Sequence, residues 1–128
     1  MKILLDTCTF LWIAGESKEL TPASLRLFCD PANDVYLSSV SVWEIVIKQR
    51  LGKLPLPSSP REFVVGNREA HEIDPLPLDE ESVLHLARLP QLHRDPFDRM
   101  LVCQAIAHGL TILTPDELVA QYPVRTAW

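Results

Sequence analysis

Three short apolar runs occur along the chain, and each is followed by a segment in which apolar residues recur with helical spacing. The runs are "KILLD" (2–6), "VYLS" (35–38) and "LTILT" (110–114). Apolar runs of this length are typical of strands that are buried on both faces, as in parallel sheets. We therefore predict three strands, with "VRTAW" (124–128) as a candidate for another.

Capping residues indicate where the helices begin and end. Thr21 before Pro22 is a typical helix start, and Gly109 is a typical helix end. We predict helices after Asp6, at 22–29, from near Ser41 to Gly52, at 80–89, at 96–108 and at 115–122. The stretch 55–78 holds five of the eleven prolines, which predicts a connection with one short helix inside it.

The alternation of strands and helices predicts the fold class. Strands separated by helices are typical of right-handed crossovers and a parallel sheet. The predicted fold is an α/β domain of three layers, α/β/α, with a small, mainly parallel sheet. The chain has 128 residues, of which 47% are apolar, so we predict a single domain over residues 1–128.

Charge, cysteines and hydropathy argue against several classes of protein. A net charge of −5 argues against nucleic-acid binding through bulk charge, but it is compatible with phosphate binding through metal ions. Cys8, Cys29 and Cys103 are odd in number and form no CxxC pair, which argues against a disulfide framework or a zinc knuckle. Asp6 interrupts the first apolar run well before about 18 residues, so we expect a cytoplasmic protein without a membrane span.

Acids lie where the predicted strands end or the next helices begin: Asp6, Glu44, Asp95, Asp98 and Asp116. Ligands of open α/β sheets bind at this edge. Most of these acids also have a capping interpretation, because helix N-termini favour carboxylates. Ser41 to Glu44 and Thr114 to Glu117 fit capping boxes, and Asp95 fits an N-cap. Thr7 or Thr9 could cap the helix after Asp6, and both roles stay open for that acid.

The acids would bind a cation together if these strand and helix ends converge. Carboxylates at close range repel one another unless a proton or a cation lies among them. Mg²⁺ and Mn²⁺ are hard ions that take oxygen ligands and would relieve this repulsion. The chemistry expected of such a site is metal-assisted hydrolysis of a phosphodiester.

Six segments carry a family resemblance, in the order "LLDTCTFLW", "SSVSVWEIVIKQRLGKL", "LPL", "HRDPFDRMLVCQA", "GLTILTPD" and "YPVRTAW". Together they resemble the PIN-domain ribonucleases, and among them the VapC-type toxins of bacterial toxin–antitoxin pairs. The resemblance implies an endoribonuclease that cuts RNA with one or two Mg²⁺ or Mn²⁺ ions and is bound by an antitoxin protein. By position, it implies that the catalytic acids and metal ligands are Asp6, Glu44, Asp98 and Asp116. We also expect a homodimer.

Other side chains are expected to support these acids or touch substrate: Thr7, Ser41, Asp95, Arg99 and Thr114. Within "HRDPFDRM" we assign Asp95 as the helix cap and Asp98 as the ligand. His93 is a weak candidate for substrate contact, because the histidines show no metal-binding spacing. Phe10, Trp12 and Trp43 offer aromatic surface that a partner helix could use.

Two alternatives stay open. A metal-dependent phosphatase of the aspartyl-nucleophile kind also begins with a strand that ends in Asp, but it needs a second Asp two residues later, where this chain has Cys8. A catalytically inactive α/β protein-interaction module would use the acids only as caps and would bind no metal.

Overall fold

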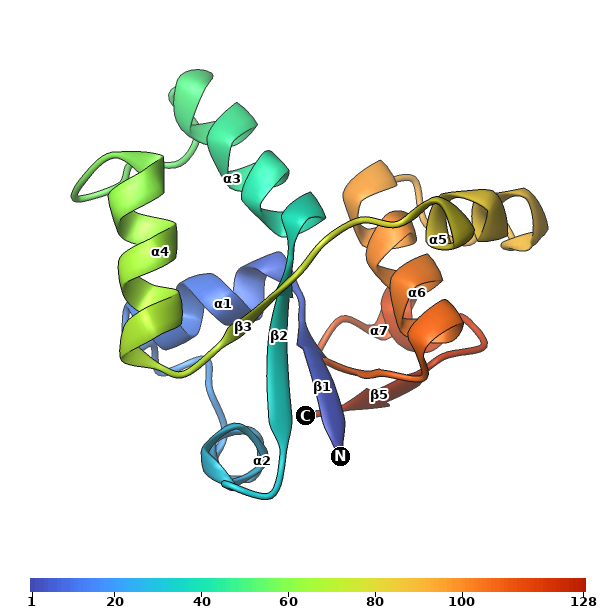
Figure 1. Ribbon diagram of the computed structural model, residues 1–128, viewed down its shortest axis with the longest axis horizontal. Coiled ribbons are helices and arrows are strands. Elements are labelled where there is room, and N and C mark those ends of the chain that lie inside the picture. The colour runs from blue at the N-terminus through green and yellow to red at the C-terminus, as the bar shows by residue number, and fades with distance from the viewer.

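The computed structural model describes residues 1–128 and has a five-stranded sheet with helices on both faces (Figure 1). The strands are β1 (Lys2–Leu5), β2 (Asp34–Ser38), β3 (Asp74–Leu76), β4 (Thr111–Leu113) and β5 (Arg125–Ala127). The helices are α1 (Thr7–Ala14), α2 (Pro22–Cys29), α3 (Ser39–Arg50), α4 (Pro60–Ala70), α5 (Glu80–His85), α6 (Pro96–His108) and α7 (Glu117–Ala120), with a 3-10 turn at Leu86–Arg88. The predicted α/β class is confirmed.

The sheet order places β1 at the centre. All neighbouring strands are parallel, in the order β3-β2-β1-β4-β5. Leu4 of β1 is in register with Tyr36 of β2 on one side and with Ile112 of β4 on the other. The carboxyl ends of these three strands therefore lie side by side, where the strand order changes direction and α/β folds bind ligands.

Alternate residues of β1 enter two separate cores. Leu4 packs with Leu101 and Val102 of α6, whereas Ile3 and Leu5 belong to the core that also contains residues of α1 and α4. Figure 1 shows α1 and α4 on one side of the sheet and α5, α6 and α7 on the other. This period of two along a central strand is what a three-layer α/β/α fold requires.

The proline-rich stretch contains a strand that the sequence did not predict. β3 (Asp74–Leu76) pairs only with β2 and forms one edge of the sheet. Pro75 is compatible with this position, because an edge strand leaves one row of backbone groups unpaired. The expected short helix in the same stretch is present as α4, and the candidate strand at the end of the chain is present as β5.

The starts of α3 and α1 differ from the prediction, as does the start of α7, which is described with the site. Helix α3 begins at Ser39, with Ser38 as N-cap accepting from the Val40 backbone N–H at 3.0 Å. Ser41 therefore lies inside the helix, and the capping box that it was expected to form with Glu44 is wrong. Helix α1 has Asp6 itself as N-cap. No helix in the structure has both the length and the apolar character that crossing a membrane requires.

Candidate active site

A cavity of about 260 Å³ opens at the carboxyl ends of the central strands. Its lining consists of Asp6, Thr7, Cys8, Trp12, Glu44, Lys48, Asp95, Asp98, Thr114, Pro115 and Asp116. The structure thus brings together the four acids assigned as ligands, although they come from four different parts of the chain. Asp95, Thr7 and Thr114 also line the cavity, whereas Ser41 and Arg99 do not.

Asp6 combines a capping role with a place in the cavity. Its Oδ1 accepts from the Thr9 backbone N–H at 2.8 Å, and its Oδ2 accepts from the Thr114 hydroxyl at 2.5 Å. Neither Thr7 nor Thr9 is the cap. Burial raises the pKa of Asp6, while hydrogen bonds from Thr114 and Thr9 act in the opposite direction. The carboxylate is therefore held in one position and removed from bulk water.

Glu44 lies in the second turn of α3 and caps nothing. The side chain is buried, and its Oε1 accepts from the Thr7 hydroxyl at 2.7 Å. Its Oε2 pairs with Lys48 one turn later, and this hydrogen bond raises the pKa of Lys48. Ser41 supports the arrangement from behind, with its Oγ 3.0 Å from the Thr7 hydroxyl oxygen. Because a buried carboxylate without a capping role needs another explanation, Glu44 is a strong candidate for a site residue.

Asp95 and Asp98 have different surroundings, as their assigned roles require. Asp95 is the N-cap of α6, and its Oδ1 accepts from the backbone N–H groups of Phe97 at 2.8 Å and Asp98 at 3.4 Å. Asp98 lies in the first turn and lines the cavity. Burial, followed by the negative charges of Asp95, Asp6 and Glu44, raises the pKa of Asp98 to about 7.

Asp116 is the N-cap of the short helix α7, which corrects the predicted capping box between Thr114 and Glu117. Its Oδ1 accepts from the Leu118 backbone N–H at 2.9 Å. The Thr114 hydroxyl accepts from the Asp116 backbone N–H at 3.1 Å while it donates to Asp6. Thr114 thus connects the first and last acids of the site.

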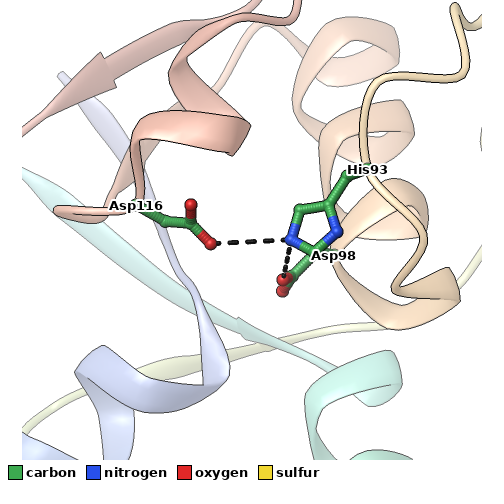
Figure 2. Close-up of side chains that lie close together, drawn as sticks. All are labelled: His93, Asp98 and Asp116. Carbon is green, nitrogen blue, oxygen red and sulfur yellow. Dashed lines mark ion pairs between the residues drawn. The ribbon is translucent and has the colours of Figure 1, made fainter.

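His93, which its spacing indicated only as a weak candidate for substrate contact, contacts two of the acids. Figure 2 shows its ring between Asp98 and Asp116, with Nε2 at 3.1 Å from Asp98 Oδ2 and 3.6 Å from Asp116 Oδ2. These three residues offer ligand atoms within 4.8 Å of one another, a group that does not include Asp6 or Glu44. The sequence feature that could have indicated this contact is the position of His93 two residues before the N-cap Asp95. There, His93 Nδ1 accepts from the Asp95 backbone N–H at 3.1 Å.

The other candidates have clear positions. The pKa of Cys8 is raised to about 11 by burial and by the charges of Asp6 and Glu44, so its thiol is neutral at physiological pH and unsuited to nucleophilic attack. Arg99 has a buried Nε without a hydrogen-bond partner and lies outside the cavity lining.

Phe10 is fully buried, which corrects its expected role in a partner surface, whereas Trp43 is 58% exposed.

Five carboxylates at the carboxyl edge of a parallel sheet, four of them assigned as ligands, and one lysine form a site suited to a hard cation rather than an anion. The family model described as PIN domain matches residues 3–124. The chain therefore belongs to the PIN domain family, and the resemblance noted in the sequence is confirmed.

Relatives and solved structures agree with this placement. Ribonuclease VapC16 of Mycobacterium tuberculosis is 38% identical over 56 residues, which are 44% of this chain and only 40% of that relative's length. The structure of VapBC2 from Rickettsia felis, bound to a DNA fragment from their promoter, has a TM-score of 0.74 at 14% identity and covers 99% of this chain and 98% of that chain. DNA-bound VapBC from Salmonella typhimurium has a TM-score of 0.68 at 18% identity, covering 99% and 97%. These structural likenesses show a shared fold.

Proposed function

We propose that this protein is an endoribonuclease that hydrolyses RNA with one or two Mg²⁺ or Mn²⁺ ions and acts as the toxin of a toxin–antitoxin pair. The observation that carries the proposal is the convergence of Asp6, Glu44, Asp98 and Asp116 on one cavity in a PIN-domain chain. The likeness to Ribonuclease VapC16 supports RNA as the substrate.

The donor set fits a hard divalent cation. All four acids offer carboxylate oxygens, and Lys48, the one lysine of the lining, is already paired with Glu44. Burial, and then the negative charges of Asp95, Asp6 and Glu44, raise the pKa of Asp98 to about 7, so a cation in the cavity would favour its ionised form. Asp6, Glu44, Asp98 and Asp116 would hold the ion, which when bound supplies an activated water and stabilises the charge that develops on the leaving oxygen.

The chain's own residues orient the acids. Thr114 fixes the Asp6 carboxylate, and Thr7 with Lys48 fixes that of Glu44. The Asp95 cap holds the first turn of α6, from which Asp98 extends. Burial raises the pKa of Asp98 to about 7, so a cation held here would compete with a proton for this carboxyl group.

The two alternatives have less support. Cys8 stands where an aspartyl-nucleophile phosphatase needs its second acid, and a thiol with a pKa of about 11 is a poor substitute for a carboxylic acid. An interaction module that uses its acids only as caps does not account for Glu44, which is buried in the cavity and caps no helix. Nuclease chemistry gives Glu44 a role as a ligand and requires no acid at the position of Cys8.

The test is RNA cleavage by the purified full chain with Mg²⁺ or Mn²⁺, and with the chelator EDTA. Asp6→Asn is the matched control, because the asparagine Oδ1 still accepts from the Thr9 backbone N–H while the charge is lost. We expect EDTA to stop cleavage and the variant to be slower by about 100-fold or more. Wild-type turnover by the variant at saturating metal, or hydrolysis of p-nitrophenyl phosphate but not of RNA, would contradict the proposal.

The proposed protein partner is an antitoxin. Similar folds occur in VapBC structures, and VapBC-5 from Mycobacterium tuberculosis is described as a member of a family of toxin–antitoxin systems. An arginine from a partner would make charge-assisted contacts with the cavity acids, and the exposed Trp43 offers apolar surface on α3. Co-expression with the upstream open reading frame should yield a complex that cleaves RNA more slowly than the free protein. If no complex forms, the toxin assignment fails while the nuclease assignment stands.

The expected homodimer stays a prediction. Sedimentation equilibrium of the free protein distinguishes a dimer from a monomer of 14.5 kDa.

A further inference from the structure

We propose that His93 is a positioning residue of the acidic cavity, which holds the carboxylates of Asp98 and Asp116 ready for a cation by placing its Nε2–H within ion-pair distance of both and not by acting as a ligand. The inference deepens the proposed metal-dependent function and rests on it. His93 lies beside the starts of α6 and α7. The acids at these starts, Asp98 and Asp116, have few other polar partners.

The His93 ring is held from two sides. The backbone N–H groups of Leu92 and His93 donate to the Tyr122 hydroxyl at 3.2 and 2.7 Å, and Tyr122 is itself buried after α7. On the other side, His93 Nδ1 accepts from the Asp95 backbone N–H at 3.1 Å. With only 15% of its side chain exposed, the ring has little freedom to turn away from the acids.

The orientation makes Nε2 a donor. A neutral imidazole carries one hydrogen, and Nδ1 must keep its lone pair to accept from Asp95. The hydrogen is therefore on Nε2, which lies 3.1 Å from Asp98 Oδ2 and 3.6 Å from Asp116 Oδ2 (Figure 2). To bind a metal, Nε2 would have to give up this hydrogen to Nδ1, and two N–H groups would then face each other at Asp95.

The two acids depend on this donor more than Asp6 and Glu44 do. The Asp98 carboxylate accepts no hydrogen bond from the protein and has its ion-pair contact with His93 Nε2 at 3.1 Å, and Asp116 Oδ2 lies 3.6 Å from the same nitrogen. Without the ring, repulsion would move the two carboxylates apart, and a cation would have to bring them together at a cost in binding free energy. Hydrogen-bonding partners of metal ligands typically change metal affinity by about 10- to 100-fold.

Two substitutions separate the site role of His93 from its role in the loop. In His93→Gln the side-chain amide nitrogen comes close to the position of Nε2, so the donor is kept and the acceptor for Asp95 is lost. In His93→Asn the side-chain oxygen comes close to the position of Nδ1, so the acceptor is kept and the donor is lost. A purely structural role in the loop predicts that the Asn variant is the milder of the two.

The experiment is calorimetric titration of the full chain with Mn²⁺ in the absence of RNA. We expect His93→Asn to bind Mn²⁺ about tenfold more weakly than the wild type and His93→Gln to stay within about threefold of it. Equal affinities in all three proteins, or the reverse order of the two variants, would overturn the positioning role. If the wild type itself binds no Mn²⁺, the proposed function has failed, and the inference fails with it.

Two further measurements keep the inference testable. Electron paramagnetic resonance of bound Mn²⁺ should show no coupling to a ring nitrogen, and such a coupling would make His93 a ligand and overturn the donor assignment. Should His93→Asn fail to fold, Tyr122→Phe takes its place, because it releases the loop without changing an acid. We expect Tyr122→Phe to weaken Mn²⁺ binding by about threefold, and wild-type affinity in this variant would count against the inference.

Discussion

The two halves of the acidic cavity differ in how their negative charge is held. In the fixed half, Asp6 and Glu44 are 7% and 4% exposed, and each accepts a hydrogen bond from a threonine hydroxyl. Lys48 adds a cation beside Glu44. In the open half, the Asp98 and Asp116 side chains are 19% and 35% exposed and share His93.

This difference indicates that the two halves would contribute to cation binding in different ways. The fixed half is built by hydrogen bonds within the protein, so its geometry does not depend on a bound ion. In the open half, burial, and then repulsion by Asp95, Asp6 and Glu44, raises the pKa of Asp98 to about 7. A cation would therefore stabilise the ionised carboxylates most in the open half. The fixed half would supply carboxylate oxygens that hydrogen bonds already hold in position.

The largest expected effect is on stability and comes from Asp98→Asn. Because the pKa of Asp98 is higher in the folded chain, the folded state binds this proton more tightly, and wild-type stability falls as pH rises from about 4 to about 7. Asp98→Asn has no carboxyl group at this position, so its stability should not fall with pH in this way. Without metal it should be more stable than the wild type by about 2 to 4 kcal/mol at pH 8 and nearly equal at pH 4.

Urea unfolding at both pH values measures this difference, and equal stabilities at pH 8 would mean that the open half is not under charge repulsion. The same variant should lose RNA cleavage, so that stability and activity change in opposite directions.

The next effect is stabilisation by the cation. An ion that binds only the folded state at about 100 times its Kd adds about 2.7 kcal/mol. Thermal melts of the wild type with and without Mn²⁺ should show this increase, and Asp98→Asn should show much less of it. If Mn²⁺ does not change the midpoint of thermal unfolding of the wild type, the distinction between an open and a fixed half has no basis.

A smaller effect concerns the cap beside the open half. Asp95→Ala should lower stability by about 1 kcal/mol, because the Phe97 N–H loses its acceptor. Cleavage should fall far less than in Asp98→Ala. Asp95→Asn is the matched control and should restore stability, since Asn caps helices as well as Asp does. Equal losses of activity in Asp95→Ala and Asp98→Ala would show that both acids are ligands.

The smallest effect comes from the fixed half. Lys48→Met breaks the ion pair with Glu44 at i,i+4 spacing, and we expect a loss of about 0.5 kcal/mol, because the lysine is partly exposed. Mn²⁺ should bind this variant more tightly, since Lys48 no longer competes for the Glu44 carboxylate. Lys53→Met, outside the cavity lining, is the control. Weaker Mn²⁺ binding in Lys48→Met would show that the lysine helps to shape the site.

The sequence predicted the parts of the site that local chemistry determines. Buried strands can be recognised from short apolar runs, and the Asp95 cap from the proline that follows it. The start of α3 was ambiguous, because serines at 38, 39 and 41 can each cap a helix, and the backbone geometry selects Ser38. Local patterns also suggested Thr7 or Thr9 as the cap that Asp6 provides.

Contacts between distant segments explain the remaining differences. Strand β3 is ordered by pairing with β2, which lies far away in sequence. The position of His93 depends on Tyr122, 29 residues later, and Asp6 is fixed by Thr114, 108 residues later. Spacing along the chain contains no information on such pairs, so the contacts of His93 became clear only from the fold, as did the acid that Thr114, already expected to support the site, holds in place.

The most direct test of the central claim is a comparison of two Mn²⁺ titrations on the wild-type chain. One follows the rate of RNA cleavage and the other follows thermal stability. If the ion that relieves the repulsion of the open half is also the ion that supports hydrolysis, the two half-saturation concentrations coincide, and both responses disappear in Asp6→Asn. Cleavage that persists in EDTA, or that saturates at Mn²⁺ concentrations far from those that stabilise the fold, would contradict the account.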